Sequence, residues 1–105
     1  MQPLGADPSL TEIQDYVAHM EIERGFSDRG VAEQALLLGE EVGELFKAIR
    51  KHERMSTATG SIVGTVDEEL ADITIYLAAI ANRLGINLAD ALRHKEELNE
   101  TRIWA

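Results

Sequence analysis

The stretch VAEQALLLGEEVGELFKAIRKH, residues 31–52, decides the fold of this chain. Within it, apolar residues recur at alternating intervals of four and three positions. They are Val31, Ala35, Leu38, Val42, Leu45 and Ile49. On an α-helix this spacing aligns the side chains in one stripe, which packs against other helices. The sequence therefore predicts a long amphipathic helix at residues 31–52.

Three further helices follow from capping patterns, in which a polar residue precedes an acidic residue by three positions. The patterns are Ser9 with Glu12, Thr65 with Glu68, and Asn87 with Asp90. The helices that they begin are predicted at residues 9–25, 65–84 and 87–101. The helix at residues 65–84 is apolar on nearly every side, which favours a central position or contact with a second subunit.

The remaining segments are predicted to connect these helices. Residues 1–8 form a loose arm, and residues 25–30 and 54–65 form loops of small and polar side chains. Since no segment has a strand pattern, the chain of 105 residues is expected to contain one all-α domain. This domain spans residues 9–105 and has a four-helix bundle-like fold. A domain of this size often gains stability by oligomerising.

The composition excludes several classes of function. The formal net charge of −9 repels phosphate backbones, so nucleic acid is not an expected partner, and a nucleotide must bring or find cations. Because the chain has no cysteine, it has no disulfides, thiolate metal sites or cysteine nucleophiles. No apolar run approaches the ~20 residues of a membrane span, and no secretion signal precedes the first helix. We therefore expect a cytoplasmic protein without membrane contacts.

Two pairs of carboxylates lie on the two long helices, with three positions between the members of each pair. They are Glu41 with Glu44 and Glu69 with Asp72. All lie on or beside faces that should be covered, and such carboxylates cannot all stay ionised between two helices without cations. An all-oxygen ligand set suits a hard divalent ion such as Mg²⁺ or Mn²⁺. The alternative, a solvated acidic face, fails for Glu69 and Asp72 because their helix offers almost no polar face.

A di-iron centre in a helical bundle is a rival explanation of these carboxylates. Such sites require the motif Glu-x-x-His on inward faces. The residues three positions before His19, His52 and His94 are Tyr16, Ile49 and Ala91. The motif is absent, so this rival is set aside.

The order of the motifs resembles the all-α NTP pyrophosphatase superfamily, and in particular the MazG-like nucleotide pyrophosphohydrolases. The matching motifs, within residues 31–104, are Glu40-Glu41-x-x-Glu44, Glu69-x-x-Asp72 and Lys95-x-x-x-Asn99-x-x-Arg102. The resemblance implies that Mg²⁺ is bound by Glu41, Glu44, Glu69 and Asp72. It also implies hydrolysis of a nucleoside triphosphate to the monophosphate and pyrophosphate by a homodimer or homotetramer.

The last helix carries a second set of candidate site residues. Lys95, Asn99 and Arg102 fall within one arc of it, and the resemblance implies that this end of the chain contacts phosphates. Pairing of cations with the helix C-terminus is the alternative, which explains Arg102 but not its alignment with Asn99. Glu40 and Glu41 are the candidate catalytic residues. Glu40 either orients or deprotonates the attacking water or is a solvated surface residue.

The base-binding residues are the least determined by the sequence. Phe26, Tyr76 and Trp104 can each stack on a base, or can belong to the core or to an interface. Phe26 and Tyr76 are retained as candidates. Phe26 is preferred because it lies in a loop where members of the family that this chain resembles place base-contacting aromatics.

Two other functions remain open. The first is a non-catalytic helical module in which divalent ions only stabilise an oligomer, although a structural metal would not need Lys95, Asn99 and Arg102. The second is a phosphoribosyl-ATP pyrophosphatase, which shares the fold and the reaction type. The local sequence of the motifs ranks this alternative below a MazG-like enzyme.

Overall fold

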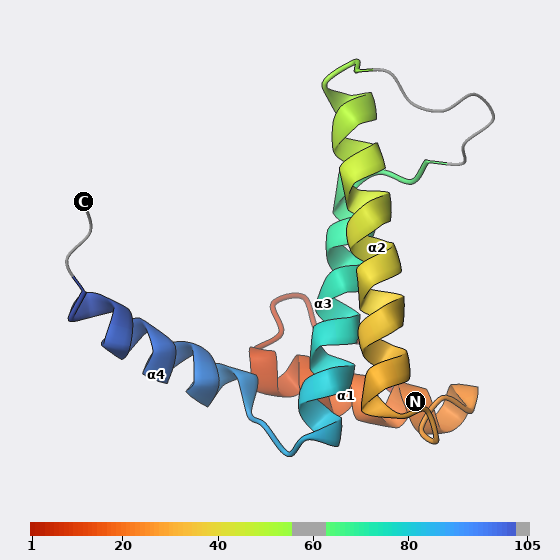
Figure 1. Cartoon of the computed structure of the whole chain (residues 1–105). Helices are drawn as coiled ribbons and strands as arrows, with labels where there is room; N and C mark the ends of the chain where they lie inside the picture. Colours follow the sequence, from red (N-terminus) through yellow and green to blue (C-terminus); the bar gives the residue numbers. More distant parts are fainter. Residues whose placement is uncertain (56–62, 103–105) are drawn as a thin grey trace.

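The computed structural model describes residues 1–55 and 63–102, and these residues form helices and connecting segments without a strand (Figure 1). The helices are α1 (Leu10–Arg24), α2 (Val31–His52), α3 (Val66–Arg83) and α4 (Leu88–Glu100). They lie where the sequence predicted them, and the all-α fold class is confirmed. Part of the predicted loop at residues 54–65 lies outside the described residues, as does Trp104. Among the described helices, none has the length and apolar character of a membrane span.

Side chains form the predicted caps of α1 and α4. At α1, Oγ of Ser9 accepts a hydrogen bond from the backbone N–H of Glu12, and Oε1 of Glu12 accepts one from the backbone N–H of Ser9, both at 3.1 Å. At α4, Oδ1 of Asn87 accepts a hydrogen bond from the backbone N–H of Asp90 at 2.9 Å. Each bond satisfies a backbone donor that a helix start leaves without an intrahelical partner.

The capping box predicted at Thr65 and Glu68 is wrong. Thr65 occupies the N-cap of α3, but no side-chain capping hydrogen bond is present there among the described residues. A hydrogen bond from the Thr65 side chain instead lowers the pKa of the Asp67 carboxyl. The predicted start of α3 is therefore right, although the capping contact is not.

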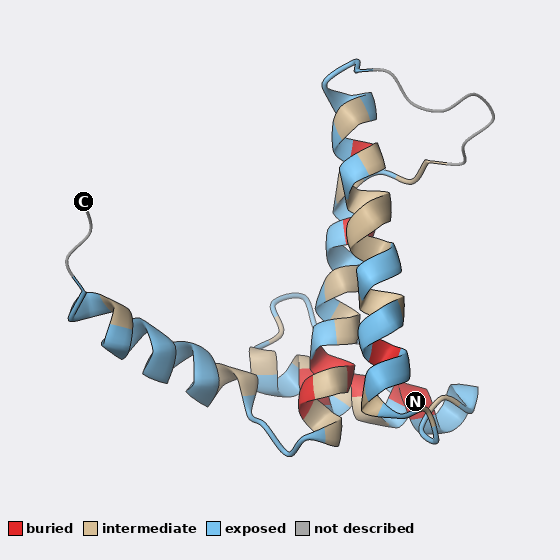
Figure 2. Ribbon diagram, viewed as in Figure 1, coloured by how far each residue is buried: buried red, intermediate tan, exposed pale blue. Residues whose placement is uncertain are grey.

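The core lies where α1 crosses the adjoining ends of α2 and α3 (Figure 1). α2 and α3 run antiparallel, side by side, and each packs along the other. At the crossing, Val17 and Met20 of α1 are buried against Ala78 and Ala79 of α3, and this is where buried residues concentrate in Figure 2. The opposite half of the α2–α3 pair therefore extends beyond the core.

Helix α4 leads away from α2 and α3 and packs chiefly on α1 (Figure 1). No residue of α4, which lies wholly within the described ranges, is buried. Leu92 and Leu98 of α4 are 58% and 51% exposed, and Leu70 and Leu77 of α3 are 50% and 45% exposed. The predicted central position of α3 is thus met only on its sides toward α1 and α2. A single chain leaves apolar surface of α3 and α4 uncovered.

Candidate metal and nucleotide site

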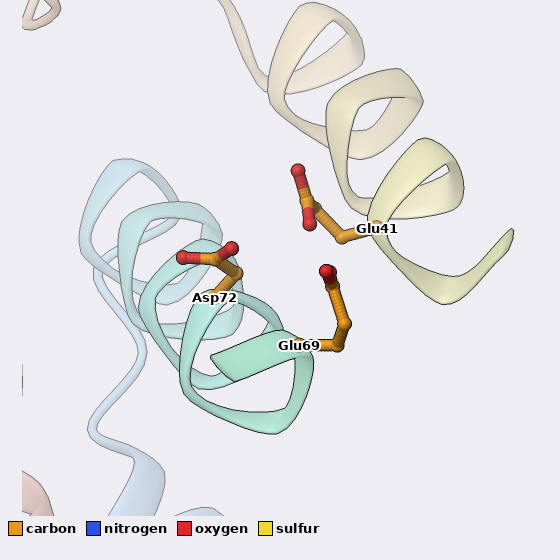
Figure 3. A group of neighbouring side chains, drawn as sticks. All are labelled: Glu41, Glu69 and Asp72. Carbon is orange, nitrogen blue, oxygen red and sulfur yellow. The ribbon is translucent and has the colours of Figure 1, made fainter. Parts of the chain in front are cut away.

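Three of the carboxylates that the sequence singled out converge between α2 and α3 (Figure 3). Glu41 comes from the middle of α2, and Glu69 and Asp72 come from the first turns of α3. Because Glu69 and Asp72 are three positions apart, they project from the same side of their helix. One carboxylate oxygen of each of the three residues lies within 4.8 Å of those of the other two.

The site has a buried floor and an open side. Glu69 is only 7% exposed, and its Oε2 has no hydrogen-bond partner among the described residues. Asp72 is exposed, so the expectation that Asp72 lies on a covered face is wrong for the single chain. Helix α3 packs against α1 and α2, and α4 leads away from α2 and α3 without adding a further layer to them. The cluster therefore meets solvent at Asp72, whereas Oε2 of Glu69 is shielded from solvent.

The electrostatics of the cluster show a shortage of positive charge. Burial, a hydrogen bond with Glu69 and the negative charge of Asp72 raise the pKa of Glu41 to about 7, and the charge of Glu44 acts in the same direction. A proton held at Glu41 offsets part of the negative charge that these carboxylates share.

The residues present fit a divalent cation. The converging atoms are all carboxylate oxygens, which Mg²⁺ and Mn²⁺ prefer as ligands. Oε2 of Glu69 is a buried polar atom without a hydrogen-bond partner among the described residues, and a cation would satisfy it. The cluster therefore has the donor chemistry of a metal site.

Glu40 and Glu44 lie outside this group of described residues. The carboxylate Oε1 of Glu44 is 3.6 Å from Nζ of Lys47, one turn further along α2. Glu40 is exposed. A role for Glu44 as a ligand and for Glu40 at the attacking water thus remains a prediction.

A cavity of about 150 Å³ adjoins the cluster and shares Asp72 with it. Its lining includes Phe26 and Tyr76, the two base-binding candidates of the sequence, together with Arg29 and Gln34. The guanidinium carbon of Arg29 stands 4.0 Å from the centroid of the Phe26 ring. Burial, and then the charge of the carboxylate cluster, raises the pKa of Tyr76. The cavity therefore places two aromatic rings beside the carboxylates.

Arg83 fixes the turn that carries Phe26 and Arg29. Its guanidinium donates to the backbone carbonyls of Arg29 at 2.7 Å and of Phe26 at 3.0 Å. It also donates to the carbonyl of Ala79 at 2.9 Å and pairs with both carboxylate oxygens of the buried Glu21. One side chain at the end of α3 thus holds α1 and the wall of the cavity together. The hydrogen bonds with Glu21 raise the pKa of Arg83.

Sequence reasoning missed this group of buried polar residues. Glu21 and Arg83 are far apart in the sequence and belong to no common motif, and each resembles an ordinary charged residue near a helix end. The available signal is the position of Arg83 at the end of an apolar helix that the sequence predicts to pack against other helices. A charged side chain at such a place needs a partner.

The structure does not bring Lys95, Asn99 and Arg102 to the carboxylate cluster of the same chain. Lys95 and Asn99 lie on α4 and Arg102 follows it, on the segment that leads away from α2 and α3 (Figure 1). The side-chain amide of Asn99 donates to Glu96 at 3.4 Å. A phosphate-binding role of these residues remains a prediction, and at a shared site it requires a second chain.

The chain is similar to proteins of known family along most of its length. A model of the MazG nucleotide pyrophosphohydrolase domain matches residues 29–102. The dATP/dGTP diphosphohydrolase of Salmonella phage PMBT28 is 35% identical over 82 residues, which are 78% of this chain and 23% of that protein. The chain therefore spans less than a quarter of the length of this curated relative.

The fold is also similar to two crystal structures of iMazG from Vibrio DAT 722. The form named Ntag-iMazG has a TM-score of 0.65 at 31% identity and covers 93% of this chain and 100% of its own. The form named Ctag-iMazG has a TM-score of 0.64 at 32% identity and covers 90% and 100%. The similarity includes the region of the carboxylate cluster, since it extends over nearly the whole of both chains.

Proposed function

Because the chain belongs to the MazG nucleotide pyrophosphohydrolase family, we propose that it hydrolyses a nucleoside triphosphate to the monophosphate and pyrophosphate. The observation that carries this proposal is the convergence of Glu41, Glu69 and Asp72 around a buried oxygen without a partner among the described residues. A second observation supports it, namely the adjoining cavity lined by Phe26 and Tyr76.

In the proposed reaction, water attacks the α-phosphorus. The bond between this phosphorus and the oxygen that bridges to the β-phosphorus breaks, and pyrophosphate leaves with that oxygen. Glu41 and Glu40 are the candidates for accepting the proton of the water. Glu41 is the better placed, since it lies within the cluster, whereas Glu40 is exposed one residue outside it.

The proposed cofactor is Mg²⁺, for which Mn²⁺ can substitute, held by Glu41, Glu69 and Asp72, with Glu44 as the further ligand. When bound, such an ion offsets the repulsion between the acidic protein and an anionic substrate and polarises phosphoryl oxygens. The protein contributes the fixed α2–α3 pair, which holds the carboxylates of both helices in reach of one ion. Glu44 joins this set only if its carboxylate moves from Lys47.

The proposed assembly is a homodimer or homotetramer that shares its sites. In it, Lys95, Asn99 and Arg102 of one chain contact the triphosphate held by the carboxylates of another. Two features support this arrangement. The α4 segment leads away from the cluster of its own chain, and Leu70 and Leu77 of α3 expose apolar surface that a second chain can cover.

Deoxynucleoside triphosphates are the proposed substrates. The similarity to a phage dATP/dGTP diphosphohydrolase supports them, although this chain spans only part of that relative. The test is a screen of the eight common NTPs and dNTPs with Mg²⁺, followed by chromatography of the products. We expect monophosphate and pyrophosphate without free phosphate, and ¹⁸O from labelled water in the monophosphate. A diphosphate with orthophosphate contradicts the mechanism, and no turnover of any triphosphate favours a module in which metal only stabilises the oligomer.

A further inference from the structure

Gln34 is a buried polar residue that the reaction does not use. It lies in the first turns of α2 and is 2% exposed. Its Nε2 donates to Oε2 of Glu21 at 3.3 Å. Its Oε1 is shielded from solvent and has no hydrogen-bond partner among the described residues. A buried acceptor without a donor is costly, so its presence needs a reason.

The orientation of the Gln34 amide is fixed by its neighbour. Arg83 donates to both oxygens of Glu21, so both of these oxygens act as hydrogen-bond acceptors. Turning the amide over would place its oxygen against a carboxylate oxygen. Nε2 of Gln34 therefore faces Glu21. Oε1 is the atom left without a partner, and exchanging the nitrogen and the oxygen of the amide is not an alternative.

Gln34 also lines the cavity beside the carboxylate cluster. The cavity of about 150 Å³ is bounded by Asp72 at the cluster and by the rings of Phe26 and Tyr76. Sites for molecules of drug size measure ~300–1,000 Å³, so this cavity accepts one part of a nucleotide. The aromatic walls suit a planar base, with the triphosphate directed past Asp72 to the carboxylates.

We propose that Gln34 is a specificity-determining residue, whose Oε1 accepts a hydrogen bond from the exocyclic amino group of a nucleobase in this cavity. The inference rests on the proposed function, since it requires a nucleotide at the cluster. An exocyclic amino group projects beyond the ring and can reach a recessed acceptor. The oxo groups of thymine and uracil would instead face Oε1 of Gln34 as a second acceptor. The substrates are therefore triphosphates of the purines that carry an amino group, adenine and guanine, rather than of thymine or uracil.

Matched substrate pairs test this assignment. dATP is compared with the triphosphate of purine 2′-deoxyriboside, which lacks the 6-amino group, and dGTP is compared with dITP, which lacks the 2-amino group. For the protein as it stands, we expect kcat/KM to fall about tenfold or more on removal of the amino group in at least one pair, which corresponds to ~1.4 kcal/mol. In the variant Gln34→Leu, which keeps the approximate size but removes the acceptor, the ratio within that pair should approach one.

Gln14→Leu is the matched control. Gln14 is also buried, but all its polar atoms are engaged, with Asn82, with the carbonyl of Ile86 and with the backbone N–H of Leu88. Its loss should lower stability and leave the ratio within each pair unchanged. The comparison of substrate pairs in the unmodified protein stands even if Gln34→Leu does not fold.

The outcomes separate the two proposals. Equal kcat/KM within both pairs in the unmodified protein overturns the role of Gln34 and leaves the pyrophosphohydrolase intact. The same conclusion follows if Gln34→Leu keeps the preference for the amino group. Absence of turnover with any triphosphate overturns the proposed function itself, and with it this inference.

Discussion

Gly64 lies directly against the carboxylate of Glu69, so that a methyl group at residue 64 would overlap Oε1 of Glu69. The same methyl carbon would stand 3.5 Å from Cδ of Glu69 and from Oε2 of Glu68. The backbone of Gly64 does not have a positive φ, so the contact and not the conformation is what favours glycine here. The segment before α3 thus forms a wall behind the most buried carboxylate of the cluster.

For Gly64→Ala, we expect a loss of metal affinity with little change in folding. The atom that must move is the far end of a side chain, and moving it displaces a proposed ligand oxygen. The Mg²⁺ concentration for half-maximal activity should rise about tenfold or more, as for other changes to residues that support metal ligands. Titration of activity with Mg²⁺ measures this.

Gly39→Ala is the control for that change. Among the described residues, nothing lies within 4 Å of a methyl group at residue 39 of α2. Replacing an exposed glycine inside a helix should stabilise the protein by ~1 kcal/mol and leave the Mg²⁺ titration unchanged. Equal Mg²⁺ titrations for Gly64→Ala and the parent would show that Gly64 does not position Glu69.

For Asp72→Asn, we expect the order of stability to depend on metal. With EDTA, removing one of the crowded negative charges should leave the protein as stable as the parent or more stable. With Mg²⁺ the parent should gain more stability than the variant, because the ion binds the folded parent more tightly than the folded variant. Thermal melts of both proteins under both conditions measure this, and activity should be abolished or greatly weakened in the variant. A variant that is less stable by the same amount in both conditions, with activity intact, contradicts a metal-binding role of Asp72.

For the metal-free protein, we expect stability to fall as the pH rises. The folded pKa of Glu41 is about 7, above its ordinary value of 4.5, so the folded state binds more protons than the unfolded state between these values. The contribution of Glu41 is therefore fully present below pH 4.5 and is lost as the pH rises through 7. Melts in EDTA at several pH values should show this decline, and Glu41→Gln should flatten it. A decline of equal slope in Glu41→Gln would assign it to other groups.

For Arg83→Met, we expect a large loss of stability, because Glu21 would remain buried without its ion-pair partner. Breaking a buried ion pair in this way costs ~3–5 kcal/mol, and the turn that carries Phe26 would lose its anchor as well. The control is Arg93→Gln, which removes an ion pair with Asp90 whose side chains are both 67% exposed. That change should cost less than ~1 kcal/mol. Chemical denaturation at one protein concentration compares them, and similar losses for both variants would show that the Arg83 pair is not a structural anchor.

For the assembly, we expect that two inactive variants restore activity when they are mixed. Asp72→Asn damages the carboxylate face, and Lys95→Ala damages the proposed phosphate-binding face of α4. If each site combines faces from two chains, random re-pairing into two-fold dimers should recover about a quarter of the parent activity. Light scattering should show no monomer at micromolar concentration. A folded monomer with full activity, or a mixture that stays inactive after subunit exchange, contradicts a shared site.

The sequence predicts the positions of the helices well because their signals are local. Ser9 with Glu12 and Asn87 with Asp90 specify helix starts through contacts three residues apart, and the structure contains both. The burial of Glu69 is also predicted, because its helix has almost no polar face. The capping contact predicted for Thr65 fails because its side chain can form a hydrogen bond with either a backbone donor or a neighbouring carboxylate. A spacing rule does not choose between the two.

What the sequence does not predict depends on how the helices meet. A periodic stripe shows which face of a helix is apolar, but not which helix covers it, so the departure of α4 and the exposure of Asp72 were not foreseen. The same limit applies to Gln34 and Arg83. The roles of Gln34 and Arg83 are recognisable only from their contacts with Glu21. These contacts join three helices from distant parts of the chain.

The crowding of Glu41, Glu69 and Asp72 has a consequence for the order of ligand loading. If the cluster holds Mg²⁺ as proposed, a triphosphate without the ion would meet like charge there, whereas a bound ion would offer it positive charge. Each ligand therefore improves the site for the other, and by reciprocity the two affinities must change by the same factor. At low free Mg²⁺ the protein should thus retain little nucleotide, and its turnover would follow the concentration of the metal–nucleotide complex rather than that of either component.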